Sequence, residues 1–202
     1  MARPRRSEHI REALLNQGLE MFIDQGYHGT GIKEIVDRVK VPKGSFYNYF
    51  ESKEQFGAEV IRRYAKWVVD NMATWLNGSE DNALDALKQF FEQEMQRHQE
   101  VKAGCLIGNL GAELGGSSEL CQQAMLDGFQ GMKQQFLRTL KRGQTQGTIP
   151  SNVSAEALAD FLISAYEGAL LRMQIEASVE PIRQLSQFLN GYLCSLSDNG
   201  AK

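Results

Sequence analysis

Residues 42–50 read "PKGSFYNYF" and place polar, hydrogen-bonding residues around two apolar side chains. Phe46 and Phe50 are four residues apart, the spacing of two side chains on one face of a helix, so we expect them to be buried. Serine and asparagine bond base edges or phosphates, tyrosine binds phosphate or packs on a thymine methyl group, and glycine lets the backbone approach a strand closely. The residues expected on the open face are Lys43, Gly44, Ser45, Tyr47, Asn48 and Tyr49. The pattern indicates a helix that contacts DNA, although spacing alone fits a corner of a helical bundle equally well.

Basic residues gather near the N-terminus. Residues 1–66 contain 12 Lys and Arg and 9 Asp and Glu, a net charge of +3, whereas residues 67–202 contain 10 and 16, a net charge of −6. Lys53 stands at the start of an expected helix, where backbone N–H groups also attract phosphate. An arm able to follow the DNA backbone or enter a minor groove carries Arg3, Arg5 and Arg6. This asymmetry favours a polyanionic partner for the basic head, although solvated surfaces also carry such charge runs.

Apolar residues recur with the helical period along the whole chain, and we find no useful run with the period of a strand. Gly26 is placed to end the first helix in a left-handed conformation, Thr30 to cap the second, and Ser52 with Gln55 to form a capping box. We therefore expect an all-α protein of about nine helices. After the first helix, the expected helices cover residues 31–39, 42–48, 52–76, 82–100, 105–114, 118–142, 154–178 and 181–196.

Composition and motifs exclude several classes of protein. No run reaches the roughly 18 apolar residues of a membrane span, and no apolar stretch typical of a secretory signal follows the basic start. Three widely spaced cysteines, Cys105, Cys121 and Cys194, argue against a disulfide framework and a cysteine-based zinc site. We expect a cytoplasmic protein without a metal, a cofactor or a membrane partner.

The second and third expected helices, 31–39 and 42–48, fit a helix-turn-helix whose second helix enters the major groove. The same region also carries a family-specific pattern. It resembles the DNA-binding head of the tetracycline-repressor family over residues 26–56, "GYHGTGIKEIVDRVKVPKGSFYNYFESKEQF". The resemblance implies a head at 1–51, a ligand-binding and dimerisation body at 52–202, and a homodimer that binds a palindromic operator until a small molecule enters the body. The DNA contacts that it implies are Thr30, Lys33, Ser45, Tyr47, Asn48, Tyr49 and Lys53.

One residue departs from the family pattern. The family often has glycine in the turn between the second and third helices, where this chain has Lys40. A positive φ angle is costly for lysine, so we expect a turn of slightly different shape.

Residues 103–114, "AGCLIGNLGAEL", are similar to a segment of electrophile- and acrylate-responsive members of that family. In some of those members the matching cysteine is the sensing thiol, which puts Cys105 forward. A place in the first turn of a helix would also lower the pKa of the Cys105 thiol. The alternative is that Cys105 is a small buried apolar residue, as lone cysteines commonly are.

Large apolar side chains in the body are expected to form its core and partly to line an effector pocket. The pocket candidates are Trp67, Met72, Trp75, Phe91 and Phe129. The last two long helices are expected to pack against a second copy in a four-helix bundle. The interface candidates are Leu158, Leu162, Ala165, Ala169, Met173, Leu185, Leu189 and Tyr192.

The chain is thus interpreted as an effector-responsive, DNA-binding transcriptional regulator, most simply a repressor and not an enzyme. Two alternatives remain. One is an enzyme with Cys105 as nucleophile, for which no histidine close in sequence supplies a base. The other is a protein-binding adaptor whose head no longer binds DNA.

Overall fold

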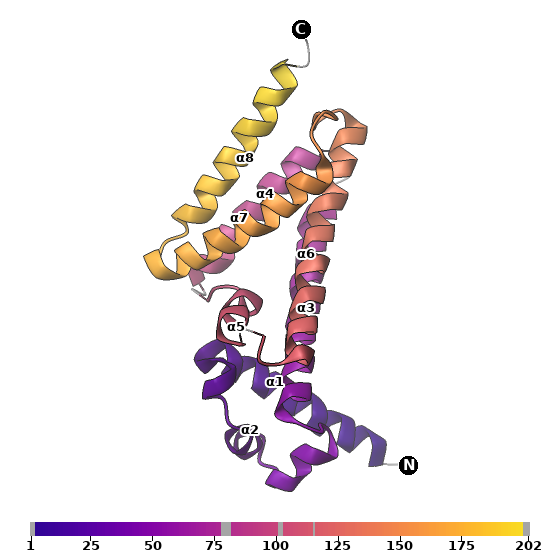
Figure 1. Ribbon diagram of the computed structural model, residues 1–202, viewed down its shortest axis with the longest axis vertical. Helices are drawn as coiled ribbons and strands as arrows, with labels where there is room; N and C mark the ends of the chain where they lie inside the picture. The colour runs from indigo at the N-terminus through magenta and orange to yellow at the C-terminus, as the bar shows by residue number, and fades with distance from the viewer. Residues whose placement is uncertain (1–2, 78–81, 101–102, 115, 200–202) are drawn as a thin grey trace. The chain divides into compact units, whose positions relative to one another are not determined.

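The computed structural model describes residues 3–77, 82–100, 103–114 and 116–199, and these residues form two compact units. The first unit comprises residues 1–66 and 106–128, and the second comprises residues 67–105 and 129–202. Every regular element of the described residues is a helix (Figure 1). The all-α class expected from the sequence is therefore confirmed.

The first unit contains the N-terminal helices. Its elements are α1 (Arg3–Gly29), α2 (Ile32–Val39), the 3₁₀-helix η1 (Lys43–Asn48), the first part of α3 (Lys53–Asn77), α5 (Leu106–Leu114) and the first part of α6 (Glu119–Gln146). Helix α1 packs against both α2 and α5, so this unit contains α5 as well as the N-terminal helices. The functional boundary expected between residues 51 and 52 stays a prediction.

The core of the first unit is aromatic. Phe46, Phe50 and Phe56 are buried, and each ring centroid lies 4.9–5.3 Å from the other two. Phe22 extends the cluster, with its ring centroid 6.1 Å from that of Phe56. Burying large rings removes much apolar surface from water, which fixes η1 against α1 and α3. The burial expected for Phe46 and Phe50 is confirmed.

The second unit contains the later helices. Its complete elements are α4 (Ala83–Glu100), α7 (Ala155–Glu176) and α8 (Glu180–Asn199), and it also includes the remaining parts of α3 and α6. Helix α8 packs against both α4 and α7. Rings of Phe90, Phe91, Phe136 and Tyr166 meet in its core at centroid distances of 5.1–6.2 Å.

Local capping follows the sequence closely. Ser52 Oγ accepts a hydrogen bond from the Gln55 backbone N–H, which confirms Ser52 as the cap of α3. The return bond of the predicted capping box differs, because Gln55 Oε1 accepts from the backbone N–H of Glu51 rather than that of Ser52. Ser154 caps α7 by accepting a bond from the amide of Ala157. In the part of the chain that the structure describes, no helix is both long enough and apolar enough to cross a bilayer.

Three local expectations are wrong. Thr30 does not cap α2, because Gly31 occupies the N-cap and the Thr30 hydroxyl donates to the Gly26 carbonyl. Lys40 does adopt the left-handed conformation, with φ 59° and ψ 45°. The helix at 42–48 is a 3₁₀-helix of six residues, Lys43–Asn48, with i to i+3 hydrogen bonds in place of the i to i+4 bonds of an α-helix.

Candidate DNA-binding face and effector-sensing thiol

The outward face of η1 carries the polar residues expected to contact DNA. Lys43, Gly44, Tyr47 and Asn48 are exposed, while Ser45 and Tyr49 are half-buried. The Tyr47 side chain is 54% exposed, and its ring rests edge-on against the buried ring of Phe46, at 5.4 Å between centroids. The face is therefore open to a partner and held from behind by the aromatic core.

Helix α2 adds one open basic side chain to this region. Lys33 lies in the first turn of α2 and is exposed. A lysine in the first turn adds its ammonium to the N–H groups that already attract phosphate there. Lys33 is therefore available for the contact expected of it.

Two of the residues expected to contact DNA are engaged elsewhere. Thr30 is completely buried, so its side chain has no access to DNA, and this expectation is wrong. The ammonium of Lys53 donates to the Tyr27 carbonyl at 2.6 Å and lies 4.3 Å from the centre of the Tyr27 ring. Burial lowers the pKa of Lys53, and the carboxylate of Glu113 partly offsets this. The Lys53 ammonium thus holds the end of α1 at Tyr27 rather than being a free phosphate ligand.

The N-terminal arm is helical where the structure describes it. Helix α1 begins at Arg3, so the arm expected to follow the DNA starts as helix. The side chains of Arg3, Arg5 and Arg6 lie outside the described residues.

Cys105 immediately precedes α5, rather than lying in its first turn, and it is only 7% exposed. Its thiol donates a hydrogen bond to the carboxylate of Glu167 on α7, within the second unit. Burial raises the pKa of Glu167 to about 7, and the bond from Cys105 partly opposes this rise. The other oxygen of that carboxylate, Oε1, is inaccessible to water and accepts no hydrogen bond from the described residues. A thiol therefore faces a carboxylate that is able to exchange a proton near neutral pH.

The other two cysteines differ sharply in access. Cys121 is completely buried in the first unit, and burial raises the pKa of its thiol. Its sulfur donates to the Glu54 carbonyl at 3.6 Å. Cys194 is exposed, so it is the cysteine most open to reagents among the three.

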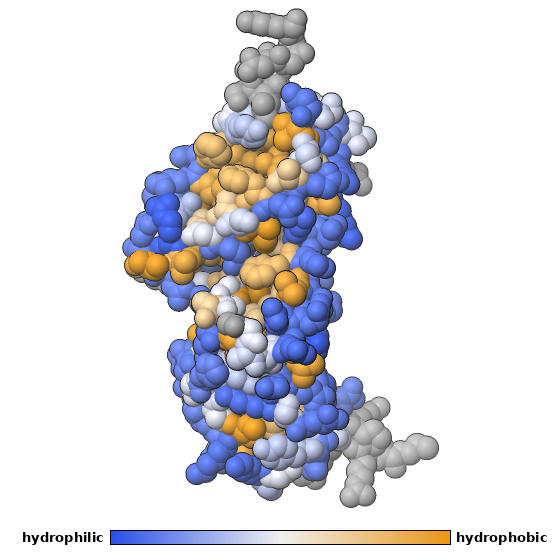
Figure 2. Space-filling model, in the orientation of Figure 1, coloured by the Kyte–Doolittle hydropathy of each residue, from blue (hydrophilic) through white to orange (hydrophobic). Residues whose placement is uncertain are grey.

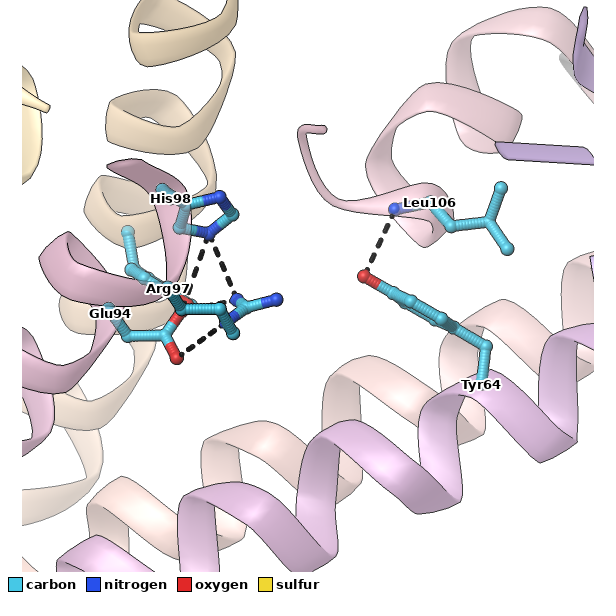
Figure 3. A network of polar contacts seen from close by, with 6 residues as sticks. Tyr64, Glu94, Arg97, His98 and Leu106 are labelled. Carbon is cyan, nitrogen blue, oxygen red and sulfur yellow. Dashed lines mark hydrogen bonds and ion pairs between the residues drawn. The ribbon is translucent and has the colours of Figure 1, made fainter. Parts of the chain in front are cut away.

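The second unit contains another buried carboxylate, that of Glu94, which has both ionic and hydrogen-bonding partners. Glu94, His98 and Tyr166 are each no more than 3% exposed. Glu94 forms an ion pair with Arg97 at 2.5 Å and approaches His98 Nε2 at 3.6 Å (Figure 3). It also accepts a hydrogen bond from the Tyr166 hydroxyl. Burial alone would raise the pKa of Glu94, but the bonds from His98, Arg97 and Tyr166 lower it to about 2.

The start of α5 is tied to α3 within the first unit. The Tyr64 hydroxyl accepts a hydrogen bond from the Leu106 amide at 3.3 Å (Figure 3). This amide is one of the groups at a helix start that lack an acceptor within the helix. Tyr64 thus fixes α5 directly after Cys105.

The residues expected to line an effector pocket do not all lie inside the protein. Met72 and Phe91 are buried and Trp75 and Phe129 are half-buried, but Trp67 is 50% exposed with the Arg97 guanidinium 5.5 Å from the centre of its ring. A cavity of about 260 Å³ in this unit is lined by other residues: His98, Gln99, Met173, Ala177, Ser178 and Val179. Trp67 therefore lies at the surface, and the effector pocket formed by these candidates stays a prediction.

Helices α7 and α8 do carry an exposed apolar face, but of the residues expected there only Tyr192 belongs to it. Leu158, Leu162, Ala169, Met173, Leu185 and Leu189 are buried within the chain, Ala165 is half-buried and Tyr192 is 40% exposed. The exposed apolar residues are Phe161, Leu171, Ile175, Phe188 and Tyr192, and apolar colour gathers over these helices in Figure 2. A groove of about 320 Å³ between the two helices has Phe161 and Phe188 in its walls. This apolar face is defined by these five residues.

Comparison with known proteins identifies the family. A family model for bacterial regulatory proteins of the tetR family matches residues 14–60, and one for the tetracyclin repressor-like C-terminal domain matches residues 82–189. The chain is 34% identical over 175 residues to the HTH-type transcriptional repressor DhaR of Mycobacterium sp. (strain GP1), and the match covers 87% of each protein. The chain belongs to the TetR family.

Two further comparisons concern one relative. This TetR-family chain is 31% identical over 180 residues to the HTH-type transcriptional repressor NemR of Escherichia coli (strain K12), covering 87% of this chain and 90% of NemR. The crystal structure of reduced E. coli NemR matches with a TM-score of 0.83 and 28% identity, over 89% of this chain and 94% of that one. The interpretation as a DNA-binding transcriptional regulator is confirmed, and these relatives give no support to the enzyme or the adaptor.

Three carboxylates of this TetR-family regulator were missed by sequence reasoning: Glu94, Glu113 and Glu167. Glu94 and His98 are four residues apart on the face of α4 that buries Phe90 and Phe91, so a polar pair within an apolar stripe was a usable signal. The partners of Glu113 and Glu167 are distant in sequence, and no local pattern points to them.

Proposed function

We propose that this TetR-family chain is a homodimeric repressor that binds a palindromic operator through η1 and is released by an effector acting on the second unit. The observation that carries the proposal is the exposed face of η1, with Lys43, Tyr47 and Asn48 outward and Phe46 and Phe50 in the core. Two relatives, DhaR and NemR, are named as repressors, which supports repression rather than activation.

Two heads are needed to bind two half-sites about one helical turn apart, so the proposal requires a dimer. The apolar face of α7 and α8 supports this, because large apolar side chains such as Phe188, which is 61% exposed, favour burial against a partner. Phe188 and Tyr192 already stack, with ring planes 3° apart, and present one flat surface. A second copy placed on this face would bury it in a helical bundle.

Cys105 is proposed as the effector-sensing thiol, and an electrophile as the effector class. Glu167 supports the choice, because its carboxylate accepts the thiol hydrogen and its pKa of about 7 suits proton exchange near neutrality. Addition of the sulfur to an activated alkene then forms a C–S bond as the C=C π bond breaks. The thiol proton passes to Glu167, and the alkene carbon that receives the π electrons takes up a proton in return, so the product is a neutral thioether. The added group has little room beside a side chain that is only 7% exposed, so the residues packed around Cys105 must shift.

Operator binding is tested by sequencing the genomic fragments that the purified protein retains. A repressor retains a few fragments that share a palindrome, and its affinity for them falls steeply as salt rises. Retention without any shared sequence would contradict the proposed function.

The sensing step is tested in a Cys194→Ser background, because Cys194 is exposed and would react with any thiol reagent. We expect N-ethylmaleimide to release operator from this background, and Cys105→Ser to abolish the release without affecting binding. Cys121→Ser serves as the matched control and should respond as the background does, since Cys121 is buried. Normal release from the Cys105→Ser variant would eliminate the thiol and leave a reversible ligand as the effector.

A further inference from the structure

Helix α1 is kinked at Gly26, three residues before its end, and the residues from Gly26 to Gly31 form the turn that leads into α2. The φ angle of 73° and ψ angle of 179° at Gly26 interrupt the helical backbone, so the next amides start a new turn without helical acceptors. Glu113, on α5, supplies the acceptors. Its Oε2 atom accepts a hydrogen bond from the Tyr27 amide at 2.9 Å, and its Oε1 atom accepts one from the His28 amide at 2.6 Å.

The same turn is held from two other directions. The Tyr27 carbonyl accepts the bond from the Lys53 ammonium at 2.6 Å, and the Gly26 carbonyl accepts one from the Thr30 hydroxyl at 2.7 Å. A Cβ atom at residue 26 would lie 2.6 Å from Glu113 Oε2, so the carboxylate fills the space that a side chain would need. The glycine is therefore required both by its positive φ and by the carboxylate.

This turn sets the position of the DNA-binding elements. Helix α2 begins at Ile32, directly after the turn, and α2 in turn packs against η1. Within the first unit, the turn is thus the point at which the helix-turn-helix is attached to α5, whose residues are far away in sequence.

We propose that Glu113 is a positioning residue for operator binding, whose carboxylate holds the amides of Tyr27 and His28 so that α2 and η1 present the DNA-binding face in one orientation. The inference rests on the proposed operator binding and deepens it, since it gives α5 a direct bond to the head. A head freed from this bond samples other orientations, and affinity falls in proportion to the fraction in the competent one.

The experiment compares Glu113→Ala with Glu119→Ala, which removes an equal charge from an exposed site on α6 in the same unit. We expect Glu113→Ala to bind the operator about tenfold more weakly than Glu119→Ala, as the loss of two bonds to a charged group would allow. Affinity for unrelated DNA and the salt slope should be equal in the two variants, because no phosphate contact is removed. Glu113→Gln keeps one acceptor oxygen and should be intermediate.

Two further measurements separate positioning from folding. Urea unfolding gives the folded fraction, and a variant that is merely unstable would lose operator and unrelated DNA alike. Amide exchange should show lost protection at Tyr27 and His28 in Glu113→Ala while Phe46 and Phe50 stay protected. Wild-type operator affinity in Glu113→Ala would overturn the inference alone, whereas a wild type that binds no operator would contradict the proposed function.

Discussion

The hydroxyl of Tyr166 donates a hydrogen bond to the carboxylate of Glu94, while the next residue, Glu167, keeps a carboxylate oxygen that is unpaired among the described residues. The pKa values of these two carboxyl groups, both in the second unit, consequently shift in opposite directions. The pKa of Glu94 is lowered to about 2, since its hydrogen bonds outweigh burial, and burial raises the pKa of Glu167 to about 7. One acid resists protonation and the other resists ionisation.

Glu94→Gln is expected to remove part of the stability at neutral pH. A carboxylate with a lowered pKa in the folded state stabilises the fold above its unfolded pKa of about 4.5, and this stability is lost as the pH falls toward 2. The loss for Glu94→Gln at pH 7 should be about 2–3 kcal/mol, and the difference from wild type should shrink below pH 4. Urea unfolding at pH 7 and pH 3 measures this. Glu92→Gln, exposed on the same helix, is the control and should change neither value.

Glu167→Gln is expected to raise the stability of the fold at neutral to alkaline pH, the opposite of the effect of Glu94→Gln. A carboxyl group with a raised pKa in the folded state contributes stability below its unfolded pKa of about 4.5, and this contribution is lost as the pH rises through about 7. Glu167→Gln should therefore stabilise the protein by about 1–2 kcal/mol at pH 8 and have little effect at pH 4.5, a range reduced because the residue is partly exposed. Thermal unfolding at both pH values checks this, and equal effects at the two would contradict it.

Lys40→Gly is expected to stabilise the protein, because Lys40 has a left-handed backbone that glycine adopts without strain. The gain should be about 0.5–1 kcal/mol, since the relief of strain exceeds the entropy that glycine adds to the unfolded chain. Lys43→Gly, three residues away in η1, is the matched control and should destabilise. A loss of stability in Lys40→Gly would show that the turn differs from the one described.

Phe188→Arg is expected to give folded monomers that no longer bind operator, because Phe188 is 61% exposed and lines two grooves on the proposed dimer face. Gln187→Arg adds the same charge to an exposed neighbouring residue and should leave the dimer intact. Leu162→Arg should instead unfold the second unit, since Leu162 is completely buried. Sedimentation velocity with circular dichroism distinguishes these results, and a dimeric Phe188→Arg would place the interface elsewhere.

Asn48→Ala and Lys43→Ala should weaken operator binding in different ways. Loss of Asn48 should reduce the preference at one base pair by about 1–3 kcal/mol if the amide contacts that base with two bonds. Loss of Lys43 should weaken binding to all sequences and reduce the salt slope by about one unit. Titrations against single-substitution operators at several salt concentrations measure both. The opposite assignment of the two effects would mean that the base contact and the phosphate contact are exchanged.

The sequence by itself determined the helices, the head and the family. Helix bounds depend on local features, such as the apolar repeat and the caps at Ser52 and Ser154, which act within a few residues. The helix-turn-helix lies within one short segment, so the inward Phe46 and outward Tyr47 were readable from spacing. Lys40 shows the limit of such reasoning, because packing of α2 against η1 imposes a backbone that lysine does not favour.

Only the tertiary structure decided which face of α7 is buried and which distant groups meet. Apolar residues occur on more than one side of α7, so periodicity cannot choose between Leu162 and Phe161; the fold of the second unit turns Leu162 inward and leaves Phe161 exposed. Glu113 and Tyr27 are 86 residues apart, and Cys105, just before α5, meets Glu167 on α7. Such pairs carry no local signature, because their energies come from burial and from hydrogen bonds that exist only once the chain has folded.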